Sequence, residues 1–160
     1  MSKTVELGDF EPEKHNCSLL LYRHIATKGA QAGSVLGAAS VLPTLAYKAY
    51  SAGSGSITGP EVLQLLTQRS AAGCQYGFAA VSVLGAIRIL SIDKEGVQDR
   101  AYRLHYNDAQ KRCDKFWLYS GAAGAAAGYA MGAKVFGSAA LGGVAGLLAH
   151  IMAPAPNKDE

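Results

Sequence analysis

The side chains that could carry catalysis or hold a metal are few and widely spaced. They comprise four histidines and three cysteines: His15, His24, His105, His150, Cys17, Cys74 and Cys113. The histidines share no metal-ligand spacing, and the cysteines form no CxxC pair. The sequence also lacks the HExxH, GxSxG and GxxxxGK[ST] motifs. We therefore expect no enzyme activity, no cofactor and no metal, and we interpret the cysteines as free thiols.

Two ionisable residues, Arg88 and His150, adjoin long apolar runs. An ionisable side chain at membrane depth is a candidate for a proton or ion pathway. Both residues, however, lie near the end of their run, where a side chain can reach the membrane interface instead. Interfacial anchoring is therefore the favoured interpretation, and the pathway role stays open.

The segment DRAYRLHYNDAQKRCDKFW, residues 99–117, is the most distinctive polar stretch. Opposite charges alternate along it, and Asp108 and Arg112 have the i, i+4 spacing of a helical ion pair. Three interpretations stay open: docking to a protein partner, binding of an anionic lipid such as cardiolipin, and a solvated, self-paired helix. The candidate docking residues are Arg100, Tyr102, Arg103, Asn107, Gln110, Arg112, Asp114 and Lys115.

The composition favours a membrane setting for these residues. Hydrophobic residues make up 49% of the chain and charged residues only 17%, and 19 of the 160 residues are glycine. Small apolar side chains bury little area, so a water-soluble core of this composition would be weak. The net charge of +3 is interleaved with acids and forms no basic stripe, which argues against nucleic-acid binding.

Apolar runs predict the fold class: an all-α membrane protein, a small bundle of four Gly/Ala-rich transmembrane helices. A spanning helix needs about 20 mostly apolar residues. The fourth run is shorter, so three spans are the alternative. We expect one membrane domain, with a polar helical segment between the second and third spans. The expected spans are residues 25–50, 71–92, 116–136 and 138–153, the charged segment is 93–115, and the polar tails are 1–24 and 154–160.

The basic residues predict an orientation. Arg23 and Lys28 flank the first run, and segment 93–115 holds six further Lys and Arg residues, whereas the loop at 51–60 has none. The positive-inside rule places the N-terminus, the charged segment and the C-terminus on the cytoplasm-equivalent side, which is the matrix in a mitochondrion.

Glycines recur at intervals of four in all four runs, so each run carries a GxxxG face. In lipid, such faces let helix backbones approach closely. The alternative is Gly/Ala-rich filler with pairs arising by chance. The candidate packing residues are Gly33, Gly37, Gly73, Gly77, Gly124, Gly128, Gly132, Gly142 and Gly146.

The stretch DRAYRLHYNDAQKRCDKFWLYSGAAGAAAG, residues 99–128, resembles NUXM-type accessory subunits of mitochondrial respiratory complex I. In these subunits a polar "R-AYRL…N…Q…D" stretch leads into a Gly/Ala-rich membrane helix. The matching positions are Arg100, Ala101, Tyr102, Arg103, Leu104, Asn107, Gln110 and Asp114. The resemblance covers about a fifth of the chain. It implies a non-catalytic, multi-pass subunit of the inner-membrane arm of NADH:ubiquinone oxidoreductase, without cofactors, that contacts other membrane-arm subunits and lipids.

A looser resemblance concerns the number of Gly-rich runs and their GxxxG spacing. In these features the chain is similar to the Tim17/Tim22/Tim23 family. That resemblance implies the alternative function, a preprotein translocase or small-solute channel subunit. It matches no polar motif of that family.

Overall fold

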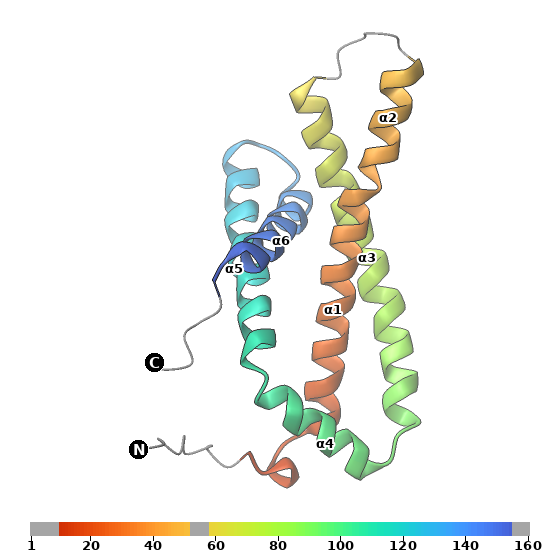
Figure 1. Ribbon diagram of the computed structural model, residues 1–160, viewed down its shortest axis with the longest axis vertical. Coiled ribbons are helices and arrows are strands. Elements are labelled where there is room, and N and C mark those ends of the chain that lie inside the picture. Colours follow the sequence, from red (N-terminus) through yellow and green to blue (C-terminus); the bar gives the residue numbers. More distant parts are fainter. Residues whose placement is uncertain (1–9, 52–57, 155–160) are drawn as a thin grey trace.

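The computed structural model describes residues 10–51 and 58–154, and the regular elements in these ranges are all helices (Figure 1). A short 3-10 helix, η1 (Pro12–Lys14), precedes the α-helices. The α-helices are α1 (Cys17–Ala39), α2 (Val41–Ser51), α3 (Gly59–Leu90), α4 (Lys94–His105), α5 (Asp108–Ala130) and α6 (Val135–Met152). The expectation of an all-α protein is confirmed for these residues, and α4 supplies the expected polar helix.

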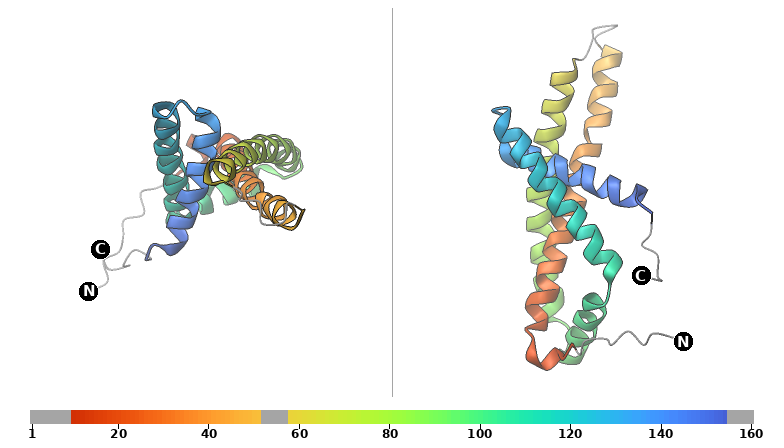
Figure 2. Two further views of the ribbon diagram at one scale, coloured as in Figure 1. Left: turned by 90° about the horizontal axis from the view of Figure 1, so that it is seen from above. Right: turned by 90° about the vertical axis from the view of Figure 1, so that its left-hand side faces the viewer.

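The helices form two antiparallel pairs. Helices α1 and α2 run along one side of the molecule, and α3 returns beside them (Figure 1). Helices α5 and α6 make a second hairpin, which packs through α6 against α3 and α1. Helix α4 crosses one end of the long pair and leads the chain into the second hairpin (Figure 1). In Figure 2, α6 crosses the long axis of α3 steeply, so the hairpins are not a bundle of parallel helices.

Two of the described helices, α3 and α6, are long and apolar enough to cross a membrane. The expectation of four spans, or three, is therefore not supported. Helices α1 and α5 have the required length, at 23 residues each, but not the apolar character. Much of their run is glycine, alanine and serine, whose small side chains add little hydrophobic drive. Charged residues inside the helices, such as Lys28 in the middle of α1 and Asp114 in the second turn of α5, lower it further.

The expected first span, 25–50, is interrupted at Ser40, where α1 ends and α2 begins. Pro43 lacks the backbone N–H that would bond the carbonyl four residues earlier, and its ring crowds that carbonyl. At the break, the Ser40 hydroxyl donates to the Gly37 carbonyl at 2.7 Å. The proline was visible in the sequence, and its effect explains the break.

The helix bounds differ from the expected ranges because polar side chains cap the N-termini of helices within segments that were expected to lie outside the spans. The Asn16 side chain accepts from the Leu19 N–H at 3.0 Å, so α1 begins inside the expected tail. Asn107 caps α5 in the same way through the Gln110 N–H at 3.0 Å, inside the expected segment 93–115. Such caps stabilise a helix by about 1 kcal/mol. Helix α3 begins at Gly59, next to a proline suited to a first turn.

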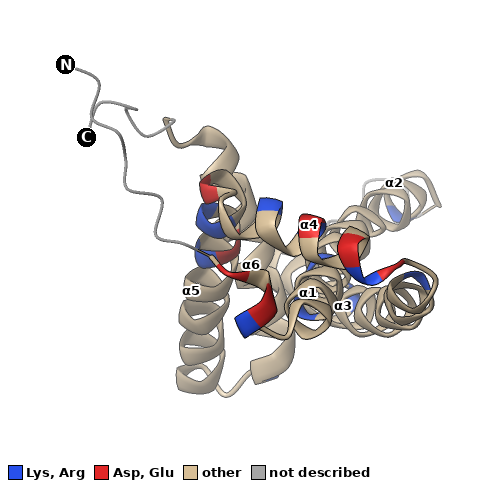
Figure 3. Ribbon diagram, turned by 90° about the horizontal axis from the view of Figure 1, so that it is seen from below, with Lys and Arg blue, Asp and Glu red and all other residues tan. Residues whose placement is uncertain are grey.

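The end of the molecule near α4 has its own small core. Its buried members are Phe10, Cys17, Leu21, Val97 and Ala101. These side chains join the segment before α1 to α4 and α1. Seen from this end, Lys, Arg, Asp and Glu gather on α4 and the start of α5, whereas the rest of α5 and α6 carries almost none (Figure 3). The molecule therefore has one charged end.

Candidate functional site

Asp114 is the centre of a polar cluster between the two hairpins. Its Oδ1 accepts hydrogen bonds from Lys28 Nζ at 2.7 Å and Gln31 Nε2 at 2.8 Å, both on α1. Gln110, one turn earlier on α5, donates through Nε2 at 3.1 Å. Lys28 also donates to the Gln31 side-chain carbonyl. One carboxylate thus links α5 to α1 across 86 positions of sequence.

The cluster is half-buried, and its degree of burial determines how strongly solvent screens the charges of Lys28 and Asp114. Side-chain exposure is 30% for Lys28 and 33% for Asp114, whereas Gln31 is only 3% exposed. A buried amide without a partner costs about 1–3 kcal/mol, so the Asp114 carboxylate satisfies a group that would otherwise destabilise the fold. The Lys28–Asp114 pair is partly screened by solvent, so its worth lies mainly in fixing the geometry of the two helices.

His24 lies at the edge of this cluster, with Nδ1 4.0 Å from Asp114 Oδ2. Desolvation by burial, followed by the nearby positive charge of Lys28, lowers the pKa of His24 below its ordinary value of 6.5, and Asp114 opposes this only in part. Neutral His24 is therefore favoured in the folded protein.

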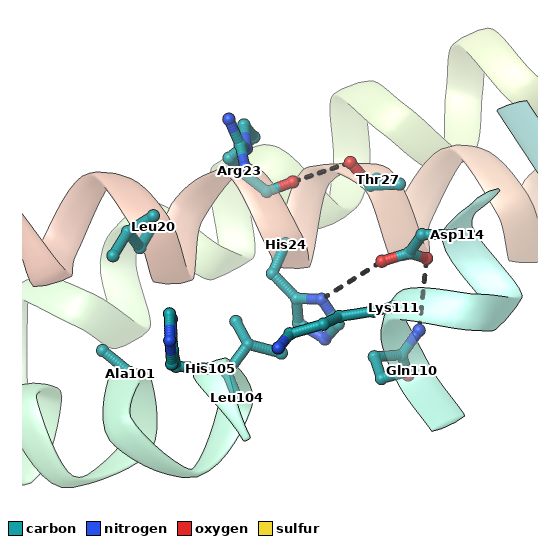
Figure 4. A pocket seen from close by; sticks show the side chains of 10 residues that line it. All are labelled: Leu20, Arg23, His24, Thr27, Ala101, Leu104, His105, Gln110, Lys111 and Asp114. Atoms are coloured by element: carbon teal, nitrogen blue, oxygen red, sulfur yellow. Dashed lines mark hydrogen bonds and ion pairs between the residues drawn. The ribbon is translucent and has the colours of Figure 1, made fainter. Parts of the chain in front are cut away.

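A cavity of about 190 Å³ adjoins the cluster between α1, α4 and α5 (Figure 4). His24 projects into it from α1, His105 from α4 and Lys111 from α5 (Figure 4). Its lining residues are Leu20, Arg23, His24, Thr27, Ala101, Leu104, His105, Gln110, Lys111 and Asp114. Polar groups from three helices therefore converge on one space.

The other candidate docking residues are spread along the surface. Arg100 Nη1 donates to the Gly96 carbonyl at 3.1 Å. Arg103 pairs with Asp99 at 2.9 Å, with 76% of the arginine side chain exposed. Tyr102 stacks at a tilt on Phe10, with ring centroids 6.4 Å apart. The arginine contacts are local and lie outside the cavity.

The last members of the candidate set continue along α5. The Arg112 guanidinium lies 5.5 Å from the centre of the Phe116 ring, within cation–π range, and Lys115 is exposed. The expected Asp108–Arg112 pair is replaced by Asp108 with Lys111, at 3.3 Å. Gln110 and Asp114 are thus the only members of the candidate docking set that line the cavity, and Asn107 acts as a helix cap.

The cluster residues on α1 were not among the candidate docking residues. His24, Lys28 and Gln31 have helical i, i+4, i+7 spacing, so they share one face of α1. Three polar residues on one face of a helix otherwise rich in small residues predict that this face contacts other polar groups. Their partner Asp114 could not be predicted, because it lies far from α1 in the sequence and no short-range pattern connects the two.

Glycine backbone makes the contact between α1 and α3. A Cβ built at Gly33 would lie 2.8 Å from the carbonyl carbon of Gly73 and 3.0 Å from the Cα of Gly77. One built at Gly37 would lie 2.8 Å from the carbonyl carbon of Arg69. These distances are shorter than van der Waals contact, so no side chain fits. Gly29 extends the face by one turn and was missed.

The α5–α6 contact is built in the same way. A Cβ at Gly124 would lie 3.0 Å from the Cα of Gly142, and one at Gly128 would lie 2.6 Å from the Ser138 Cβ. At Gly146 it would lie 2.7 Å from the Ser120 Cβ. These glycines occupy the contact that their spacing predicted.

Gly132 does not pack, so its expected role is wrong. It follows α5 with φ +66°, and no atom lies within 4 Å of a Cβ built there. Its N–H bonds the Tyr129 carbonyl at 3.1 Å, and the Ala133 N–H bonds the Gly128 carbonyl at 2.8 Å. This pattern is a Schellman helix end, whose left-handed residue favours glycine. Gly132 therefore closes α5.

Large apolar side chains cover much of the outer surface. Leu36 on α1 is 70% exposed, Leu90 on α3 is 86% exposed, and Tyr129 on α5 is 81% exposed. The buried core, by contrast, holds mainly small side chains such as Ala30, Cys74 and Ala140. Monomeric soluble proteins rarely expose apolar side chains on this scale.

The remaining chemistry-bearing side chains are the metal-ligand types and the two ionisable residues beside the apolar runs. Within residues 10–51 and 58–154, no group of three or more His, Cys, Asp and Glu side chains could hold a metal ion. Arg88 is exposed near the end of α3. His150 contacts the Phe116 ring, with centroids 5.5 Å apart, and its buried Nδ1 has no hydrogen-bond partner in the described part of the chain.

Comparison with known proteins places the chain in a family. The model of a family described as a protein of unknown function, DUF1757, matches residues 15–154. It covers both helix pairs, the polar cluster and the cavity. No curated protein matches the chain.

Proposed function

We propose that this chain, which belongs to the DUF1757 family of proteins of unknown function, is a non-catalytic accessory subunit of a membrane complex. The complex we propose is the membrane arm of mitochondrial NADH:ubiquinone oxidoreductase, in the inner membrane, with the chain crossing it more than once. One observation carries the proposal: among the described residues, the α1–α3 and α5–α6 contacts are built largely from glycine backbone and small side chains, and many large apolar side chains lie on the outer surface. Such a molecule offers apolar surface to neighbours.

The amount of surface supports this proposal. The accessible surface of the chain is 11054 Å², at a mass of 16.6 kDa. A compact monomer of that mass exposes about 7600 Å². The chain thus exposes more surface than a compact monomer of its mass, and exposed side chains such as Leu90 and Tyr129 are apolar surface that lipid or other subunits would cover.

The polar residues fit a structural role. Asp114 and Gln110 belong to the stretch that resembles the motif of complex I accessory subunits, and they tie α5 to α1 through Lys28 and Gln31. Asn107, also in the motif, begins α5. A structural role for this motif fits its place at the N-terminal cap and in the first turns of the Gly/Ala-rich helix α5, and requires no reaction chemistry.

Native gel electrophoresis of detergent-solubilised mitochondria tests the complex. We expect the chain to co-migrate with NADH dehydrogenase activity and to be identified there by mass spectrometry. Loss of the chain should lower the amount of assembled complex. Migration with a protein import complex would refute the accessory-subunit proposal and favour the Tim17-type alternative.

Carbonate extraction tests the membrane location separately. We expect the chain to remain in the membrane pellet with integral proteins, because α3 and α6 are long and apolar enough to span. Release as a soluble monomer would refute the membrane location whatever the complex.

A further inference from the structure

We propose that the cavity between α1, α4 and α5 binds the headgroup of an anionic phospholipid, and that one acyl chain lies in the adjoining apolar groove along α1. The lipid site presupposes the membrane location in the proposed function, but not the identity of the complex. The lipid site is supported by four features: the charge of the cavity, the apolar groove, their shared edge, and their position at the charged end of the molecule.

The cavity has an excess of positive charge. The guanidinium of Arg23 makes no hydrogen bond or ion pair with any other described residue. Lys111 is held only by Asp108, at 3.3 Å, and that carboxylate is 89% exposed. The one acid in the lining, Asp114, is already paired with Lys28 at 2.7 Å. Lys111 inside the cavity and Arg23 at its edge, on the other side of α1 from Lys111 in Figure 4, therefore remain for an anionic headgroup, and phosphate is the group that both bind well.

The groove beside the cavity is apolar. It has a volume of about 470 Å³ and contains Leu19, Tyr22 and Ala26 of α1 and Phe78 of α3. Leu19 is 60% exposed and Phe78 is 49% exposed, so the chain itself leaves these side chains uncovered. A hydrocarbon chain that covered them would remove apolar surface from water.

Cavity and groove meet along one edge of α1. Leu20, Arg23 and Thr27 line both of them. A molecule with an anionic head and an apolar tail could therefore occupy both spaces at once, with Arg23 beside the junction. A free phosphate ion would fill the cavity and leave the groove uncovered, which is why we assign the site to a lipid.

The site also lies at the depth where headgroups belong. Phe78 is part of α3, a helix able to span a membrane, whereas His105 and Lys111 belong to the charged end formed by α4 and the start of α5 (Figure 3). Basic residues at such a boundary attract anionic lipids.

Native mass spectrometry of the purified full chain in detergent tests the site. The probes are dioleoylphosphatidylglycerol, which is anionic, and dioleoylphosphatidylcholine, which has the same chains and no net charge. We expect phosphatidylglycerol to bind at least about fivefold more tightly. Arg23→Gln and Lys111→Gln should each weaken its binding about fivefold, the effect of one basic residue near an anionic membrane surface.

Arg103→Gln and Lys115→Gln are matched controls, because they remove the same charges from exposed positions outside the cavity. Their phosphatidylglycerol affinity should stay within about twofold of the wild type. An equal loss in these variants would mean diffuse attraction and would overturn the site. Leu19→Gln, which changes no charge, should also weaken binding by reducing the apolar groove.

Two further results separate the possible failures. If inorganic phosphate at millimolar concentration displaces the lipid, the cavity is a site for a free anion and the lipid assignment is wrong. If Arg23→Gln binds phosphatidylglycerol normally while the protein resists carbonate extraction, the lipid site fails and the membrane location stands. Circular dichroism of each variant confirms that its helices are intact.

Discussion

Replacing Gly33 with alanine adds one methyl group at the tightest part of the α1–α3 contact. A Cβ there would lie 2.8 Å from the carbonyl carbon of Gly73 and 3.0 Å from the Cα of Gly77. Ordinary contact between carbon atoms begins at about 3.5 Å, so the helices have to separate by about 0.7 Å or more. The opposing atoms are backbone, so they cannot rotate away as a side chain would.

The expected cost follows from two opposing effects. Overpacking a close contact costs about 1–3 kcal/mol, and the rigid backbone here favours the upper end of that range. Alanine is a better helix former than glycine by about 1 kcal/mol, which offsets part of the cost. The net loss in the free energy of unfolding is therefore about 2 kcal/mol. For a chain of 160 residues this lowers the melting temperature by about 4–8 °C.

The assay is thermal unfolding of the purified protein in detergent, followed by circular dichroism at 222 nm. Gly59→Ala is the control, because within residues 10–51 and 58–154 no atom outside its chain neighbours and its own helix backbone lies within 4 Å of a Cβ built at Gly59. The control should melt within about 1 °C of the wild type, since nothing obstructs its methyl group. If Gly33→Ala melts at or above the wild type, the two helices do not touch through backbone, and the proposed basis of the fold is wrong.

The remaining predictions concern the second hairpin and the polar cluster. Gly128→Leu should reduce the amount of assembled complex on a native gel, because a Cβ there would lie 2.6 Å from the Ser138 Cβ; normal assembly would exclude this contact. Asp114→Ala should lower the free energy of unfolding by about 1–2 kcal/mol, reduced from the fully buried case by solvent screening. In a double-mutant cycle with Lys28→Gln, additive losses would show that the two residues are not coupled. The pKa of His24 is lower in the folded protein than in the unfolded chain. At pH values between this lowered pKa and 6.5, the unfolded state therefore binds more protons than the folded state. Stability should therefore be full above pH 6.5 and fall on acidification through that interval. His24→Gln should flatten the decline, and an unchanged pH profile in this variant would assign it to other groups.

The sequence predicted the parts of the fold that have a local period. Gly33 and Gly37 were expected to face other backbones because of their spacing, and they lie against Gly73 and Gly77. The break at Ser40 was also within reach of the sequence, since Pro43 disfavours a continuous helix. Periodicity gave the wrong role to Gly132, because a residue four positions along still fits the pattern after the helix has ended.

The polar cluster shows what a single sequence does not contain. Asp114 was a candidate, but its partners Lys28 and Gln31 lie 86 and 83 positions earlier. Helix periodicity groups the α1 residues on one face without saying which helix covers it. The predicted number of spans was not supported, for a related reason. Helix length alone does not distinguish a helix apolar enough to face lipid from one that packs only against other helices.

The steep crossing of α6 over α3 (Figure 2) has a consequence for how the molecule could sit in a bilayer. Helix α6 has 18 residues and is about 27 Å long, slightly less than a hydrocarbon layer of about 30 Å, so it leaves no length for tilting. Helix α3 has 32 residues and is about 48 Å long, so it can lean far over and still emerge on both sides. In a flat bilayer that both helices cross, α3 is therefore the helix that tilts. The lipids around α3 would then pack against the side of a tilted helix.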